Sequence, residues 1–231
     1  MFETTRRDGV VQARREGARW LSTAWDGGYR VADAVYNVTV PEGFDSRDLD
    51  GYRADRLAEA GFPVGPTLLT GVEMRHARIA ESHPVTVLAT AGLSNPAVLP
   101  VGDEGVSEAA SDGTASWRPG TVNLVVGAAR ALDDGALATL LSTAVEAKAA
   151  TLLAASDAPG TTSDAALVGS VPSAERAAFA GSATEVGAAT RACVRDAVLA
   201  SLDARYDDAL PTVADADHGV VTDRQTDIRA P

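Results

Sequence analysis

A single lysine is the first residue of this chain to consider for proton chemistry. Among its 20 basic residues, Lys148 alone is not an arginine. Lysine, unlike arginine, readily loses its proton on burial, which suits it to general-base or nucleophile-activating roles. On a helix with about 100° per residue, Lys148 shares one stripe with Leu137, Leu141, Ala144 and Leu152. We therefore expect Lys148 on a buried face, either as a functional group or as a stem that covers the core while its ammonium reaches solvent.

An acidic residue, Glu146, precedes Lys148 by two positions and therefore projects from the opposite side of the same predicted helix. Thr139, Ser142 and Thr143 share that side. The face that they form is either solvated or the lining of a polar cleft. In the second case Glu146 is a candidate catalytic carboxylate.

Three further segments carry short hydrogen-bonding side chains. Thr90-Ala-Gly-Leu-Ser-Asn95 follows an apolar run, which is typical of a ligand-binding loop at a strand end and equally of a simple turn. Asn123 stands among apolar neighbours, so its amide needs buried partners from the backbone or from a substrate. Gly160-Thr-Thr-Ser-Asp164 is either a turn capped by Asp164 or a cradle of donors with Asp164 as base or orienting group.

Several common chemistries lack their sequence motifs here. No Gly-x-Ser-x-Gly elbow, P-loop or dinucleotide-binding fingerprint occurs in the chain. The histidines His76, His83 and His218 have no metal-ligand spacing, so we expect no metal site. Cys193 is the single cysteine, which rules out an intrachain disulfide.

The charge balance limits the possible partners. The net charge of −12 disfavours nucleic acids and anionic membranes, since both are bound through basic surfaces. A cationic substrate and adaptation to high salt both explain the acidity, and the even spread of acids favours salt adaptation. We find neither a signal-like N-terminus nor an apolar run long enough to span a membrane, so a cytoplasmic protein without membrane insertion is expected. The oligomeric state is left open.

The elements that must position these residues follow from periodicity and from turn signals. Strands are predicted at residues 20–24, 29–40, 66–72, 84–91, 121–126 and 165–171, with a strand and a helical turn within 1–18. Helices are predicted at residues 46–60 with a Ser46 cap, at 133–155 with an Asp133 or Asp134 cap, and at 184–203. Residues 102–119 are rich in Gly, Ser and Asp and are predicted to form an exposed loop.

The predicted fold class is α/β or α+β, with a mixed sheet of about five to seven strands packed by about three helices. We expect one layered catalytic domain over residues 1–206. Residues 207–231 contain few apolar residues and many Asp, which predicts an acidic, mobile tail.

Taken in order, these segments resemble the adenosylcobinamide amidohydrolase family. The resemblance covers about residues 20–200 and rests on Gly27-Gly28, Asn37, Thr90–Asn95, Gly120-Thr-Val-Asn123, Glu146-Ala-Lys148 and Gly160-Thr-Thr-Ser-Asp-Ala165. It implies hydrolysis of the amide between the propionyl arm of the corrin and aminopropanol. The product would be adenosylcobyric acid, in the salvage of cobinamide into coenzyme B12.

The chain departs from the family pattern at two places. Gly160-Thr-Thr-Ser-Asp164 replaces a Gly-Thr-Gly-Thr-Asp-like run, and Gly181-Ser-Ala-Thr-Glu-Val-Gly187 lacks the histidine of a Gly-Thr-His-Thr run. The acidic, arginine-rich composition fits a salt-adapted, archaeal-type member of the family.

Two routes for the implied amide hydrolysis follow from the candidate residues. In one, a neutral Lys148 deprotonates Ser94 or Thr90 to give an acyl-enzyme. In the other, slightly favoured because no elbow places a nucleophile, Asp164 or Glu146 activates water while the Lys148 ammonium polarises the carbonyl.

The remaining candidates are predicted to bind the substrate. Asn37, Asn95 and Asn123 suit the peripheral amides of the corrin, and Thr161 and Thr162 belong to the hydroxyl cluster before Asp164. No cofactor is expected, because the cobalt belongs to the corrinoid substrate. A corrinoid carrier or sensor without catalysis is the alternative function, and a general small-molecule amidase is a more distant one.

Overall fold

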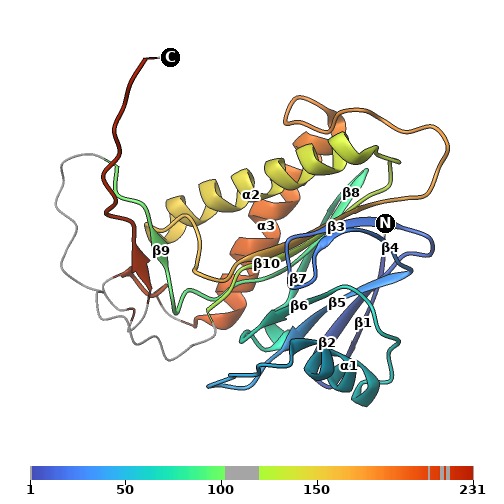
Figure 1. The fold of residues 1–231 in the computed structure, drawn as a ribbon, viewed down its shortest axis with the longest axis horizontal. Helices are drawn as coiled ribbons and strands as arrows, with labels where there is room; N and C mark the ends of the chain where they lie inside the picture. Colours follow the sequence, from blue (N-terminus) through green and yellow to red (C-terminus); the bar gives the residue numbers. More distant parts are fainter. Residues whose placement is uncertain (1, 102–119, 208, 214–215, 217–218, 231) are drawn as a thin grey trace.

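The computed structural model describes residues 2–101, 120–207, 209–213, 216 and 219–230, so the predicted loop at 102–119 lies outside the described residues. A six-stranded mixed sheet forms the middle of the molecule (Figure 1). Its strands, in spatial order, are β4 (Gly28–Val31), β3 (Arg19–Ser22), β11 (Ala165–Ser170), β10 (Asn123–Ala128), β8 (Val85–Thr90) and β7 (Arg78–Ser82). β10 and β11 run parallel, and the other neighbouring pairs run antiparallel. All residues of β8 and β10 are buried, as expected for strands that are covered on both faces.

A second sheet of four strands packs against the first. Its order is β1 (Glu3–Arg7), β2 (Val10–Arg14), β5 (Ala34–Thr39) and β6 (Thr67–Thr70), and only the β5–β6 pair is parallel. A short 3-10 helix, η1 (Met74–His76), follows β6. Away from both sheets, β9 (Ala97–Val98) pairs with β12 (Val220–Val221), which brings part of the C-terminal segment back to the loop that follows β8.

Three α-helices occur in the described part of the chain, and side chains cap all three at their N-termini. Asp48 caps α1 (Leu49–Glu59), Asp133 caps α2 (Asp134–Ser156), and Thr184 caps α3 (Glu185–Arg205). Each capping oxygen accepts a hydrogen bond from a backbone N–H of the first helical turn, which would otherwise have no partner.

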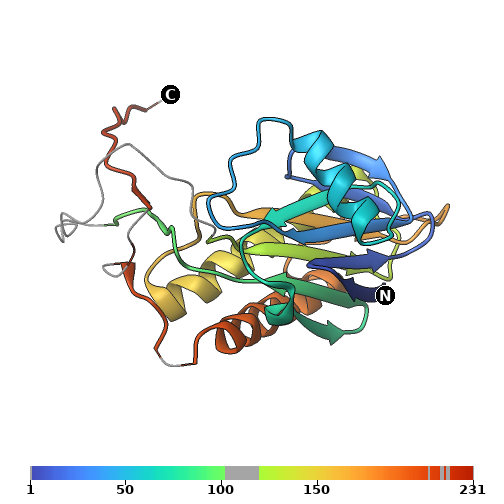
Figure 2. The same ribbon diagram turned by 90° about the horizontal axis from the view of Figure 1, so that it is seen from below.

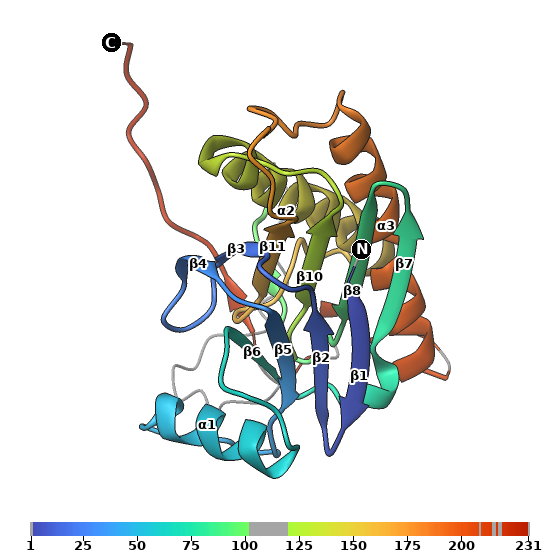
Figure 3. The same ribbon diagram turned by 90° about the vertical axis from the view of Figure 1, so that its right-hand side faces the viewer.

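The elements stack in four layers, which are clearest in Figure 2. α1 covers the outer face of the four-stranded sheet through Leu57 and Ala60. The two sheets share a core that includes Val35, Trp20 and Val125. The opposite face of the six-stranded sheet packs against α2 and α3, which lie behind it in Figure 3. Parallel β10 and β11 are joined through α2, so one end of this sheet gathers the starts of both strands.

The mixed α/β class, the three helices and a sheet of the expected size are confirmed. The single strand predicted at 29–40 is wrong: β4 and β5 belong to different sheets, because the chain turns where the backbone N–H groups of Arg15 and Gly17 bond to Asp33. The helical turn predicted within 1–18 is also wrong, since the β1–β2 hairpin occupies that region. The cap of α1 is Asp48 and not Ser46. The division at residues 206 and 207 stays a prediction.

Within the described ranges, α2 is the one helix whose length and composition would allow it to cross a membrane. Half of its most apolar stretch is buried inside the fold, where α2 packs against α3 and β11. Buried core helices often have a length and composition of this kind.

Candidate functional site

The predicted site residues gather at one end of the six-stranded sheet, which we call the polar edge. It consists of the end of β3, the end of β8, the starts of β10 and β11, and the loops at residues 91–97, 120–122 and 160–164 that join them. The strand register sets this arrangement, because Asn123 pairs with Thr90 on one side and with Ala165 on the other. Segments that are distant in sequence therefore meet here as neighbours.

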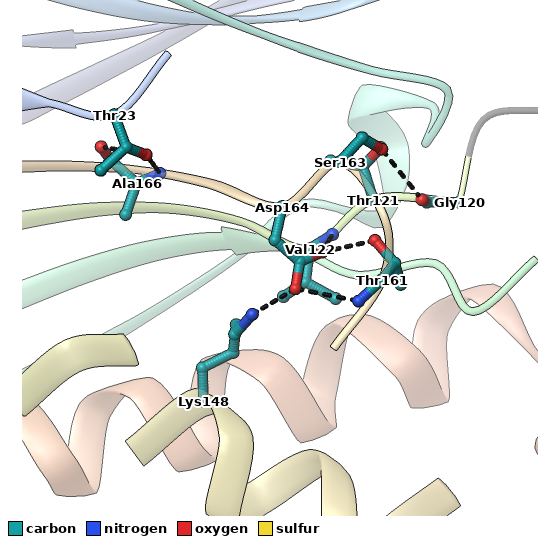
Figure 4. Close-up of polar contacts among 9 residues, drawn as sticks. All are labelled: Thr23, Gly120, Thr121, Val122, Lys148, Thr161, Ser163, Asp164 and Ala166. Carbon is teal, nitrogen blue, oxygen red and sulfur yellow. Dashed lines mark hydrogen bonds and ion pairs between the residues drawn. The ribbon is translucent and has the colours of Figure 1, made fainter. Parts of the chain in front are cut away.

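The carboxylate of Asp164 holds the polar edge together (Figure 4). Its Oδ1 accepts hydrogen bonds from the Val122 backbone N–H at 2.8 Å and from the Thr161 hydroxyl. Its Oδ2 accepts from the Thr161 backbone N–H at 3.1 Å and from Lys148 Nζ. These four donors match the four lone-pair sites of an ionised carboxylate, so Asp164 acts here as an acceptor that orders two loops and one helix.

Lys148 reaches Asp164 from α2, and its side chain is 10% exposed. The predicted burial of Lys148 is confirmed, and its ammonium is ion-paired inside the fold. Gly160 makes room for the pair: a Cβ on this residue would lie 2.5 Å from Asp164 Oδ2 and 2.8 Å from Lys148 Nζ. An ammonium has three N–H donors, so bonding to Asp164 leaves donors for another group at the same place.

The loop after β8 is fastened to the loop before β11. Asn95 Nδ2 donates to the Thr162 hydroxyl at 2.6 Å, and the Thr162 N–H donates to the Asn95 carbonyl at 3.1 Å. The Ala97 N–H donates to the Gly160 carbonyl at 2.9 Å. Ser94 is half-buried, and its backbone N–H lies close to Gly120, so the third loop joins the same cluster.

A buried network of two asparagines and a threonine links the two sheets, on the face of the six-stranded sheet that is turned away from α2. Asn37 of β5 donates to the Thr90 hydroxyl at 2.9 Å, and Asn123 donates to Asn37 Oδ1 at 2.9 Å and to the Leu69 carbonyl at 3.0 Å. The Oδ1 atoms of Asn95 and Asn123 are buried and accept no hydrogen bond from the residues that the structure describes. Unpaired buried acceptors are costly, and they mark positions where a ligand N–H could bond.

Glu146 is the predicted site residue that the structure keeps apart. It is exposed on the opposite side of α2 and pairs with Arg191 of α3. Arg191 lines a groove of about 620 Å³ between α2 and α3, whose other walls are mainly alanines such as Ala147, Ala150 and Ala188. This groove is large but poor in groups that could take part in hydrolysis, so we place the candidate site at the polar edge.

Sequence reasoning missed three polar residues of the edge. The hydroxyls of Thr121 and Ser163 lie 3.0 Å apart, and Thr23 bonds to Ala166 through both its backbone N–H and its hydroxyl. Thr121 and Ser163 each stand within a segment already singled out, so their hydroxyls could have been noticed. Thr23 carries no such signal, because it comes to β11 from 143 residues away.

Other candidate nucleophiles and ligands are less well placed. Cys193 is buried, and its removal from water raises the pKa of its thiol, which disfavours the reactive thiolate. Among the residues that the structure describes, no group of three or more His, Cys, Asp or Glu side chains is arranged to hold a metal ion.

Comparison with known proteins gives a consistent assignment. A family model described as adenosylcobinamide amidohydrolase matches residues 1–209. An adenosylcobinamide amidohydrolase of Halobacterium salinarum is 53% identical over 234 residues, covering all of both chains. One of Methanosarcina mazei is 27% identical over 196 residues, covering 80% of this chain and 90% of its own. A crystal structure of a Pyrococcus horikoshii protein aligns at TM-score 0.44 and 14% identity, over 87% of this chain and 78% of its own.

The Halobacterium source agrees with the salt adaptation that the acidic, lysine-poor composition predicts. The family match spans the polar edge, Asp164 and its donors included. By this match and by the identity to the Halobacterium protein over the whole length, the chain belongs to the adenosylcobinamide amidohydrolase family.

Proposed function

We propose that this protein hydrolyses the amide between the corrin propionyl arm and aminopropanol in adenosylcobinamide, and so releases adenosylcobyric acid for coenzyme B12 salvage. We infer the location of the reaction from one observation. The Asp164 carboxylate brings Lys148, Thr161 and the start of β10 to one point, next to the loop of Asn95, whose buried Oδ1 has no partner among the described residues. The amide to be cleaved binds at this point.

Lys148 and Asp164 have different roles in the proposed reaction. The Lys148 ammonium, with N–H groups to spare, donates to the carbonyl oxygen as negative charge develops there. Asp164 holds Lys148 in place, and its lone pairs are already engaged by four donors. Of the two routes considered, this arrangement supports attack by water on a carbonyl polarised by Lys148, but with Asp164 as a positioning residue and not as the base. The water oxygen bonds to the carbonyl carbon, the C–N bond breaks, and a proton of the water passes to the nitrogen of the departing aminopropanol. In this proposal Glu146 does not contact the amide, because it lies on the far side of α2.

The amide-bearing side chains bind the corrinoid. Asn95 Oδ1 and Asn123 Oδ1 accept hydrogen bonds from carboxamide N–H groups of the substrate, which removes the cost of their burial without partners. Asn37 and Thr90 hold Asn123 in the orientation that this needs. The exposed Thr162 and the half-buried Ser94 lie beside Asn95 on the solvent side.

The cobalt enters the site as part of the substrate, and we propose no separate cofactor. The net charge of −12 suits a small neutral or cationic corrinoid better than nucleic acid or an anionic membrane, and we propose a cytoplasmic location without membrane insertion.

The test is to incubate the purified protein with adenosylcobinamide in high salt and to follow the corrinoid by mass spectrometry. Loss of the aminopropanol unit is expected, with free aminopropanol in equal amount. A tightly bound but unchanged corrinoid would overturn the proposal in favour of a carrier or sensor. Equally fast cleavage of a simple N-substituted propionamide would point to a general amidase. A trapped acyl-enzyme on Ser94 or Thr90 would replace the water route with the nucleophilic one.

A further inference from the structure

An exposed tryptophan lies in the turn after β3, at the end of the sheet where the polar edge is found. Trp25 is 59% exposed and lies in the turn at residues 23–27 that joins β3 to β4. Trp20, by contrast, is fully buried between the sheets. Tryptophan combines a large apolar ring with one N–H donor, and it is enriched at binding interfaces for that reason.

The turn that carries Trp25 is held firmly in place. Arg53 of α1 donates to the Trp25 carbonyl at 3.2 Å, and Arg30 pairs with Asp26 at 2.7 Å. The Ala24 N–H donates to the Ser22 hydroxyl at 3.1 Å. A fixed backbone lowers the entropy lost when a ligand contacts the side chain, as expected for a pre-organised contact.

The position of the turn places Trp25 at the same end of the six-stranded sheet as the proposed reaction. β3 runs antiparallel to β11, so the turn after β3 emerges at the end of the sheet where β11 begins. Thr23 bonds to Ala166, two residues after Asp164, and Figure 4 shows this contact beside the Asp164 cluster. Two strand spacings separate β3 from β10, so the strand that ends just before Thr23 and the strand that begins at Asn123 lie about 10 Å apart.

We propose that Trp25 is a specificity-determining residue that contacts the corrin macrocycle while the amide reacts at Lys148. This inference rests on the proposed function. The substrate has two parts, a small polar amide and a large flat ring edged with methyl groups. The protein offers two matching parts at one end of a sheet, buried polar groups and an exposed indole.

The test compares Trp25→Ala and Trp25→Phe with Phe179→Ala. Phe179 is 60% exposed, as Trp25 is, but lies at the opposite end of the sheet, beside the cis-proline turn before β8 and the residues after β10. With adenosylcobinamide, Trp25→Ala is expected to raise KM on the order of tenfold with little change in kcat. Trp25→Phe is expected to keep most of the affinity, and Phe179→Ala all of it. An unchanged KM in Trp25→Ala, or an equal loss in Phe179→Ala, would overturn the inference.

A binding measurement separates this inference from the proposed activity. Adenosylcobyric acid contains the corrin but not the cleaved amide, and corrinoids quench tryptophan fluorescence. Titration is expected to quench the wild-type protein more than Trp25→Phe, which keeps Trp20 and Trp117, and to give a Kd about tenfold higher for Trp25→Ala. If the wild type binds in this way but cleaves nothing, only the proposed function fails. If it cleaves while Trp25→Ala binds normally, only the Trp25 inference fails, and a wild type that does neither overturns both.

Discussion

Glu146 and Lys148 leave the same turn of α2 in opposite directions, and their ion pairs differ in kind. Lys148 is buried, and its pair with Asp164 fastens a helix to two loops. Glu146 is exposed, and its pair with Arg191 joins two helices across a solvent groove. An exposed pair contributes little to stability, whereas loss of one partner from a buried pair leaves an unpaired charge in the interior. Removing the charge of Lys148 should therefore lower stability more than removing the charge of Glu146, two residues away.

The largest effect is expected from Lys148→Met, which removes the charge and keeps most of the side-chain volume. Asp164 would keep its neutral donors but lose its cation, so the free energy of unfolding should fall by about 3 kcal/mol. The value of kcat should fall at least about 100-fold, since the oxyanion loses its charged donor. Chemical denaturation and the release of adenosylcobyric acid measure the two effects.

A double-mutant cycle with Asp164→Asn controls for this result. Because the two residues act as one unit, the double variant should be little worse than either single variant in both stability and rate. Near-normal turnover by a folded Lys148→Met protein would show that Lys148 takes no part in the reaction. The buried and the exposed ion pair would then not differ in their effect on catalysis.

A smaller effect, limited to the packing around Lys148 and Asp164, is expected from Gly160→Ala. The added Cβ would press on Asp164 Oδ2 and Lys148 Nζ while leaving both charges in place. Overpacking of this kind costs about 2 kcal/mol, and the displaced ammonium should lower kcat more than it raises KM. Gly135→Ala is the matched control, because it lies at the start of α2 with only an ordinary contact to Asp133, and alanine there should stabilise the helix slightly. Equal stability in the two variants would mean that the pair at Lys148 is not tightly packed.

The sequence predicted local features well and long-range contacts poorly. The cap at Asp133 or Asp134 and the burial of Lys148 follow from patterns within a single helix; Asp133 is the cap, and the burial is confirmed. The division between β4 and β5 depends on which sheet each strand joins, and no local pattern records that choice.

In the candidate site, too, the sequence predicted local features but not long-range contacts. That Asn123 and Asp164 would carry hydrogen bonds was predictable from their neighbours, but their partners were not. Asn37 and Asn123 meet across 86 residues, because the two sheets pack face to face there. Helical periodicity separated Glu146 from Lys148, but the partner of each, Arg191 and Asp164, depends on how α2 packs against α3 and β11.

The smallest effect is expected from Glu146→Gln, with Arg191→Gln as its counterpart. Both partners are solvent-accessible, so the pair should contribute about 0.5 kcal/mol at low ionic strength. At about 1 M salt the screening length falls to about 3 Å, and the contribution should be close to zero. Turnover of adenosylcobinamide by Glu146→Gln should stay within about twofold of wild type at either salt concentration, since the pair faces away from Asp164. A tenfold loss of kcat with unchanged stability would place Glu146 at the substrate, and would mean that the α2–α3 groove, and not the polar edge, receives part of the corrinoid.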